Sequence, residues 1–105
     1  AFLDINPLAK GHTLVVPKTE VDYIFDINDE LLAEMHLFSK KIAKGIEKVV
    51  PCERIGMTVI GLEVPHAHIH LIPINGIGDM NFANPKLNFT SEEFERIASE
   101  IREAI

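Results

Sequence analysis

Runs of β-branched and other apolar residues, bounded by proline, glycine or asparagine, are typical of short strands. Four such runs occur, at residues 1–5, 12–16, 54–60 and 66–74. Pro7 and Pro17 follow the first two runs, and a turn around Gly61 separates the last two. We expect the first two strands to pair and the last two to form an antiparallel hairpin.

Two longer segments repeat apolar residues at intervals of three and four, which indicates amphipathic helices. The first helix is expected to begin after Asn28, a favourable N-cap, and to end before Pro51. Thr90 and Glu93 form a capping box that begins the second helix. Strands followed by a helix, twice and without regular βαβ alternation, predict an α+β fold. Its antiparallel sheet is expected to carry both helices on one face.

The length of 105 residues suits one domain, which we expect to span residues 1–105. Apolar residues make up 47% of the chain and charged residues 25%, as in ordinary globular proteins. The chain opens on Ala1 to Ile5 in what reads as the middle of a strand, without a methionine. We therefore expect that an N-terminal segment is missing from this sequence.

The formal net charge of −6 argues against a nucleic-acid polymer as partner, because such binding depends on a basic surface. No apolar run approaches the ~18 residues of a membrane span, so no membrane partner is expected. Cys52 is the only cysteine, which leaves no internal disulfide and favours a reducing, cytoplasmic location.

Three of the five histidines alternate with apolar residues near the middle of the chain, at His66, His68 and His70. Side chains two residues apart share one face of a strand. If residues 66–74 form a strand, the three imidazoles make a row on the face opposite the helices. The apolar residues that alternate with them would then face the core: Ala67, Ile69 and Leu71.

Such a row has three interpretations. As a metal site it is incomplete, because His66 and His70 would lie about 13 Å apart and a ligand such as His12 would have to join. As a catalytic site it offers neutral imidazole, a nucleophile near pH 7 whose natural target here is phosphorus. A purely structural role is disfavoured, because a row of polar rings opposite an apolar face makes a poor core. The catalytic interpretation needs no metal and no other cofactor.

The segment HAHIHLI at residues 66–72 resembles the signature of the histidine triad (HIT) family of nucleotide hydrolases and transferases. Residues 2–7 (FLDINP) resemble the ribose-side segment of that family. Residues 11–18 (GHTLVVPK) resemble its second strand, which carries a fourth histidine at His12. The order and spacing of these segments agree with the family from residue 2 to about residue 74.

The resemblance implies a covalent mechanism. His68 would attack the α-phosphorus of a nucleotide and form a nucleotidyl-histidine intermediate, from which water releases a nucleoside monophosphate. His70 would bind the phosphate oxygens. His66 and His12 would orient the rings and pass a proton to the leaving group.

The resemblance also implies a nucleotide pocket and a homodimer. Asp4 would accept hydrogen bonds from the ribose hydroxyls, and Phe2 and Ile5 would line the base pocket. A carboxylate is a good acceptor for a diol, and an apolar slot accepts a purine face. The small-molecule partner is therefore expected to be a nucleotide.

One position departs from the family pattern. Many members carry a serine, threonine or glutamine three residues before the first histidine, where it contacts phosphate, whereas this chain has Glu63 in an apolar turn. A carboxylate there would repel a phosphate. The sequence therefore leaves open a phosphoramidate or a dinucleoside polyphosphate as substrate. It also leaves open a nucleotide-binding or scaffolding protein of the same fold with little turnover.

Overall fold

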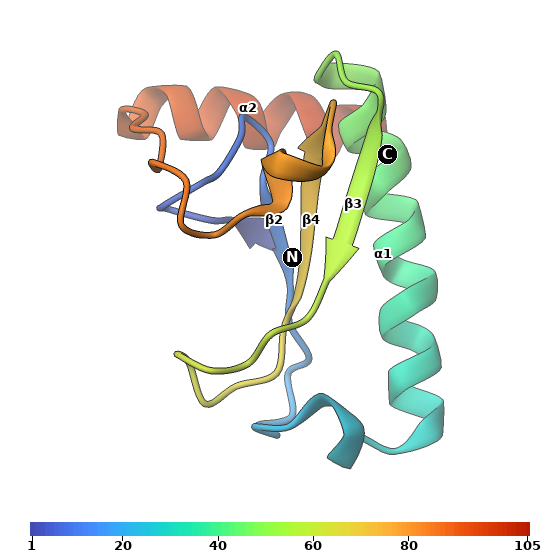
Figure 1. Ribbon diagram of the computed structural model, residues 1–105. Coiled ribbons are helices and arrows are strands. Elements are labelled where there is room, and N and C mark those ends of the chain that lie inside the picture. Colours follow the sequence, from blue (N-terminus) through green and yellow to red (C-terminus); the bar gives the residue numbers. More distant parts are fainter.

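Four antiparallel strands form one sheet, and two helices cover one of its faces in the computed structural model, which describes residues 1–105 (Figure 1). The strands lie in the order β1-β2-β4-β3. Their bounds are β1 Phe2–Leu3, β2 Thr13–Val15, β3 Arg54–Thr58 and β4 Ile69–Ile74. The pairing of β1 with β2 and of β3 with β4 confirms the two predicted hairpins. The α+β architecture is also as predicted.

Each helix begins directly after a residue whose side chain caps its first turn. In α1 (Asp29–Val49), the side-chain oxygen of Asn28 accepts a hydrogen bond from the amide of Leu31 at 2.9 Å. In α2 (Ser91–Ala104), Thr90 and Glu93 exchange the two hydrogen bonds of a capping box. Each cap satisfies amides that the first helical turn leaves without partners. Neither helix combines the length and the apolar character that crossing a membrane would need.

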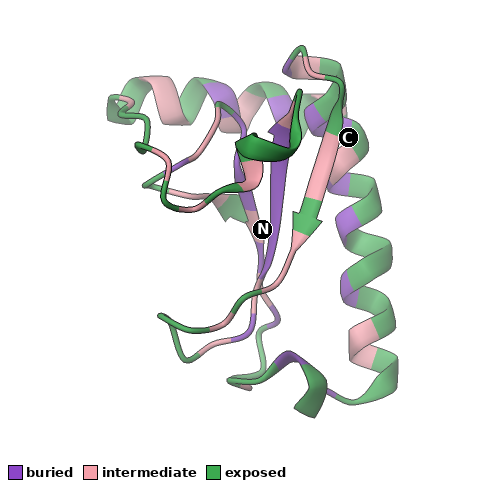
Figure 2. Ribbon diagram, in the orientation of Figure 1, coloured by how far each residue is buried: buried purple, intermediate pink, exposed green.

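The hydrophobic core lies between the sheet and the helices. Ile69 and Leu71 project from β4 toward Ile46 on α1, and all three are almost completely buried. Figure 2 shows the buried positions concentrated on β2, β4 and the inner side of α1. The remaining core residues are Val15, Ile24, Ile27, Met35, Ile42, Val50, Ala67, Ile97 and Ile101.

The opposite face of the sheet is partly covered as well, by residues 75–89, which the sequence predicted only as a loop. This segment contains the short 3₁₀ helix η2 (Ile77–Met80), which contacts β4. A Cβ atom added to Gly56 on β3 would lie 2.7 Å from the sulfur of Met80, so η2 packs closely on the sheet. Ile72 of β4 is fully buried, although it lies outside the main core.

The predicted strand at residues 66–74 is wrong in its first part, because β4 begins only at Ile69. The partner strand β2 ends at Val15, which pairs with Ile69, and Pro17 follows soon after. Proline has no amide hydrogen to donate to a sheet. The amide of Ala67 donates instead to the carbonyl of Val21 at 2.7 Å. The other three strands are also shorter than predicted.

Replacing Ile46 with alanine is expected to lower the free energy of unfolding by about 2–5 kcal/mol, because the neighbouring core cannot fully close the space. Urea unfolding at pH 7 measures this loss. Ile77→Ala is the matched control, since Ile77 is 94% exposed and should change stability by less than about 0.5 kcal/mol. Equal losses in the two variants would contradict this placement of the core.

Candidate active site

A cavity of about 460 Å³ brings three histidines together: His12, His68 and His70. Four separate parts of the chain complete its wall. These are residues 4–6, Leu14 of β2, the turn at residues 60–64, and Phe82 with Lys86 from the segment after β4. The sheet and its connections thus converge on one group of imidazoles.

His12 reaches this cavity from a tight turn rather than from a strand. Gly11 has φ +89°, a left-handed conformation that side chains other than glycine rarely adopt. A Cβ atom at Gly11 would also lie 3.0 Å from Val50, so the turn leaves no room for a side chain. The turn buries His12 to 1% exposure and directs its ring toward β4.

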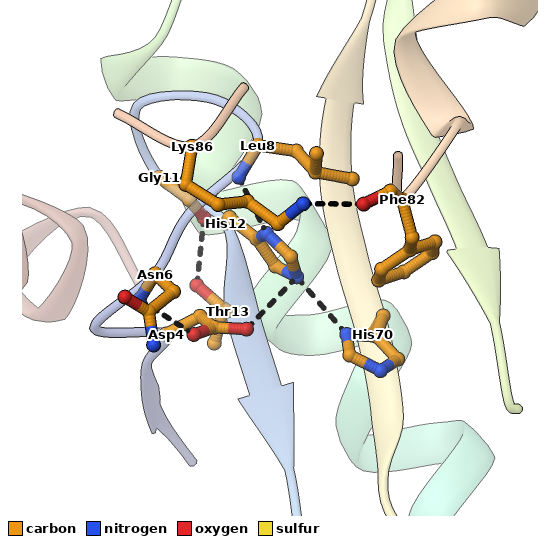
Figure 3. Close-up of polar contacts among 9 residues, drawn as sticks. All are labelled: Asp4, Asn6, Leu8, Gly11, His12, Thr13, His70, Phe82 and Lys86. Atoms are coloured by element: carbon orange, nitrogen blue, oxygen red, sulfur yellow. Dashed lines mark hydrogen bonds and ion pairs between the residues drawn. The ribbon is translucent and has the colours of Figure 1, made fainter. Parts of the chain in front are cut away.

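The hydrogen bonds of His12 determine the tautomers of two rings (Figure 3). The amide of Leu8 donates to Nδ1 of His12 at 3.0 Å, so a neutral His12 carries its proton on Nε2. That Nε2 lies 3.0 Å from Nδ1 of His70 and donates to it. His70 must then carry its own proton on Nε2. Oδ2 of Asp4 lies 3.6 Å from the same Nε2 of His12.

His68 has the opposite tautomer. Its Nδ1 lies 2.8 Å from the carbonyl oxygen of His66, and a carbonyl only accepts, so Nδ1 carries the proton. The lone pair of a neutral His68 therefore sits on Nε2. The rings of His68 and His70 are 4.7 Å apart between centroids. The cavity thus has a nitrogen lone pair from one histidine beside an N–H donor from the next.

The predicted row of three histidines on one face is wrong for His66. Its Nε2 donates to the carbonyl of Pro17 at 2.8 Å, and its side chain does not line the cavity. The cause is the late start of β4, which leaves residues 66–68 outside the alternating geometry of a strand. His68 stays beside His70 as the row predicts, and His12 joins the pair from the β1–β2 turn.

Of the predicted nucleotide-binding residues, Asp4 and Ile5 line the histidine cavity, whereas Phe2 does not. Phe2 is 57% exposed and borders a separate cavity of about 290 Å³ between β1, α1 and α2. Strand alternation would place Phe2 and Asp4, which are two residues apart, on the same face, so their separation arises because the chain leaves β1 after Leu3.

Burial dominates the electrostatics of the paired histidines. Burial, together with the smaller effect of positive charge on His68 and His12, lowers the pKa of His70 to about 4, and Asp4 opposes the shift. Burial also lowers the pKa of His12, with Asp4 opposing and Lys86 adding to the effect. Both rings are therefore neutral at pH 7. Neutrality is what their hydrogen bond requires, because Nδ1 of His70 must keep a lone pair to accept.

A metal ion is the alternative occupant of this cluster. Ligand atoms of Asp4, His12 and His70 lie within 4.8 Å of one another, which is a possible set for a cation. This set differs from the one considered for the row, since it includes a carboxylate and excludes His66 and His68. The hydrogen bonds within the cluster already satisfy its buried side-chain nitrogen and oxygen atoms. The geometry is thus accounted for without an ion.

Among the residues of the cavity wall that sequence reasoning missed are Phe82 and Lys86. The ring of Phe82 packs edge-on against His70 at 4.8 Å and against His12 at 6.2 Å between centroids. The only signal in the sequence is an aromatic residue inside a loop rich in glycine and asparagine. That signal says nothing about which face of the sheet the loop would cover.

Comparison with known proteins identifies one family. A family profile described as HIT domain matches residues 1–76. The chain is 36% identical over 111 residues to Protein hit of Bacillus subtilis (96% of this chain, 75% of that protein). It is 32% identical over 108 residues to Adenosine 5'-monophosphoramidase hnt1 of Schizosaccharomyces pombe (100% of this chain, 80% of that protein). A crystal structure of a Hit-like protein from Bartonella henselae superimposes with a TM-score of 0.83 at 30% identity, covering 98% of this chain and 77% of that one.

The low pKa of His70 predicts acid sensitivity. The unfolded chain should titrate near the ordinary value of 6.5 and the folded chain near 4, so on acidification the unfolded state binds the proton first. Stability is then complete above pH 6.5 and is lost as the pH falls toward 4. Between pH 7 and pH 5, His70 should account for a loss of about 2 kcal/mol.

Urea unfolding at both pH values, for the wild type and for His70→Asn, isolates this contribution. Asparagine does not titrate, so the variant should lose about 2 kcal/mol less than the wild type over the same interval. An identical loss in the two proteins would show that His70 is not the group responsible.

Proposed function

The chain belongs to the histidine triad family, and on that premise we propose that it is a nucleotide hydrolase acting through a covalent nucleotidyl-histidine intermediate. The observation that carries the proposal is the tautomer of His68. Its Nδ1 proton is held by the carbonyl of His66, so the lone pair needed for attack is on Nε2. His68 lines the cavity, whereas the Nε2 atoms of His12 and His70 carry protons.

In the first step, Nε2 of His68 attacks the α-phosphorus, and the bond from phosphorus to the leaving atom breaks. The leaving amine departs with the bonding electron pair and takes up a proton from solvent. The His68 ring becomes positively charged, and its Nδ1–H bond to the carbonyl of His66 then strengthens, because charged donors make stronger hydrogen bonds. Water next attacks phosphorus and gives a proton back to solvent, while the phosphorus–nitrogen bond to His68 breaks, which releases the nucleoside monophosphate and restores neutral His68.

His70 and His12 prepare the site for the phosphoryl group. The Nε2–H of His70 is the donor beside His68, suited to a non-bridging phosphate oxygen. His12 keeps that proton on Nε2 by donating to Nδ1 of His70. The side chain of His66 has another part. By donating to the carbonyl of Pro17, it holds in place the backbone carbonyl that orients His68.

Asp4 and Ile5 suit the nucleoside. Oδ1 of Asp4 accepts from the amide of Asn6 at 2.8 Å, which leaves Oδ2 to accept from a ribose hydroxyl. Ile5 is exposed in the cavity wall, where it offers an apolar surface to a purine. The name of the fission yeast relative, a monophosphoramidase, agrees with an adenosine nucleotide as substrate.

The turn at residues 60–64 favours a phosphoramidate over a polyphosphate. It contributes the apolar residues Ile60, Leu62 and Val64 and the acidic residue Glu63 to the cavity wall. A polyphosphate leaving group would place several negative charges near that carboxylate, whereas an amine would not. We therefore infer hydrolysis of a phosphorus–nitrogen bond as the main activity, with the phosphoanhydride bond as the poorer substrate.

We further propose a homodimer located in the cytoplasm. β3 is an edge strand with one unpaired side, and such edges favour pairing with another chain. Exposed apolar side chains lie on that strand at Met57 and on α1 at Leu37. The cytoplasmic location rests on the single free cysteine, Cys52.

His68→Ala is expected to lower kcat/KM for an adenosine phosphoramidate by at least about 10³-fold, because no other cavity nitrogen can attack. Intact-protein mass spectrometry soon after mixing with substrate near pH 7 should show an adduct of one nucleoside monophosphate in the wild type only. His36→Ala is the matched control, since His36 is exposed on α1 and outside the cavity.

Wild-type turnover in His68→Ala would refute the covalent mechanism. A wild type that binds nucleotide tightly but forms no adduct and releases no monophosphate would instead identify the rival function, a nucleotide-binding or scaffolding protein of the same fold. The rival function is recognised from the wild type alone, so a His68→Ala variant that fails to fold cannot be mistaken for it.

Glu63→Gln is expected to raise kcat/KM for a dinucleoside polyphosphate up to about fivefold relative to the phosphoramidate, because repulsion between exposed charges is worth less than about 1 kcal/mol. Parallel assays with the two substrates give this ratio. Glu100→Gln on α2 changes the net charge equally and lies outside the cavity, so its ratio should stay at the wild-type value. An unchanged ratio in Glu63→Gln would exclude Glu63 as a determinant of the leaving group.

A further inference from the structure

Residues 75–89 form a braced segment rather than a loose loop. Near its start, Oδ2 of Asp79 accepts from the amides of Asn75 and Gly76 at 2.8 and 3.1 Å. The side-chain amide of Asn84 donates to the carbonyl of Gly78 at 2.7 Å. These bonds tie the two halves of the segment to each other, so its conformation is specified by its own polar groups.

The braced segment is also anchored near both edges of the sheet face that it crosses. At one end Met80 packs on Gly56 of β3, and at the other the amide of Leu87 donates to the carbonyl of Pro7 at 2.9 Å. Pro7 belongs to the turn that leads to His12. The segment therefore passes from the β3 edge to the β1–β2 connection, across the face that carries His70 (Figure 1).

The span between these anchors places Phe82 against the paired histidines. Its ring contacts both of them in edge-on geometry, with centroids 4.8 Å from His70 and 6.2 Å from His12. Nζ of Lys86 donates to the backbone carbonyls of Phe82 and Asn84, which holds the backbone of this turn. Figure 3 shows Lys86 reaching across to the Phe82 carbonyl, with His12 and His70 below.

The position of the ring matters because water would compete for the nitrogens of the pair. His12 is 1% and His70 7% exposed, and the ring of Phe82 is part of what covers them. A water molecule at Nδ1 of His70 would replace His12 as hydrogen-bond partner and would stabilise protonated forms. Protonation of Nδ1 would set two donors against each other across 3.0 Å.

We propose that Phe82 is a positioning residue: by packing on both His12 and His70 it excludes water and holds the one tautomer of His70 that presents an N–H to the phosphoryl group. The consequence for turnover rests on the proposed hydrolase activity, whereas the effect on His70 does not. The charged or titratable groups that face the pair are His68 before β4, Asp4 and Lys86 beside His12, and Glu63 in the cavity wall.

Histidine ring NMR on the full chain tests the proposal directly, because nitrogen-detected spectra report both the tautomer and the pKa of each imidazole. In the wild type His70 should be the Nε2–H tautomer with a pKa of about 4. In Phe82→Ala the pKa of His70 should rise toward the ordinary value of 6.5, since burial is the largest cause of its depression. The Nδ1–H tautomer should also become populated.

Two further variants keep the test specific. Phe82→Tyr retains the ring and should retain the wild-type tautomer and pKa. Phe89→Ala removes a ring that packs edge-on against Phe94 at 5.4 Å, outside the cavity, so it should cost stability without moving His70. If Phe82→Ala does not fold, Phe82→Val serves in its place, because valine is much smaller than the ring and still apolar.

The proposal is overturned if Phe82→Ala or Phe82→Val folds and leaves the tautomer and the pKa of His70 unchanged. It is also overturned if Phe89→Ala moves them as much. For turnover, Phe82→Ala should lower kcat for the phosphoramidate about tenfold while KM changes less than twofold, and Phe82→Tyr should restore kcat. A wild type without turnover would refute the hydrolase proposal, and the NMR comparison would still decide the part that Phe82 plays.

Discussion

The site depends on one buried hydrogen bond, from Nε2 of His12 to Nδ1 of His70. It joins residues 58 positions apart, so it forms only when the β1–β2 turn and β4 are both in place. Because the amide of Leu8 occupies the other nitrogen of His12, the direction of the bond is determined by the backbone. The donor that His70 presents is therefore set by the fold rather than by solvent.

Burial makes this bond vulnerable. An unpaired polar nitrogen in the same place would cost about 1–3 kcal/mol, so the pair is stable only while each ring has its partner. Burial is also the main reason that the pKa of His70 is depressed, and a proton added at Nδ1 would remove the acceptor of the bond. Phe82 packs on His70, and the segment that carries Phe82 is tied to Pro7. The paired histidines therefore depend on contacts at both edges of the sheet.

Much of the architecture follows from local signals. Asn28 and the Thr90–Glu93 capping box mark the helix starts because each satisfies free amides of a first turn. The strand pairs follow from short connections between β-branched runs. The strand ends do not, because they depend on which neighbour is present to accept hydrogen bonds. The late start of β4, and with it the departure of His66 from the row, follows from the end of β2 at Val15.

The sequence by itself determined the family and the α+β class, because both follow from the spacing of motifs and from local hydrogen bonding. It also singled out His12, His66, His68 and His70 as candidates. Only the tertiary structure decided that His12, His68 and His70 meet in one cavity without the side chain of His66, and that Phe82 and Lys86 belong to the cavity wall. The physical reason is that the position of a loop across a sheet depends on distant anchors, here Gly56 and Pro7, which no local pattern records.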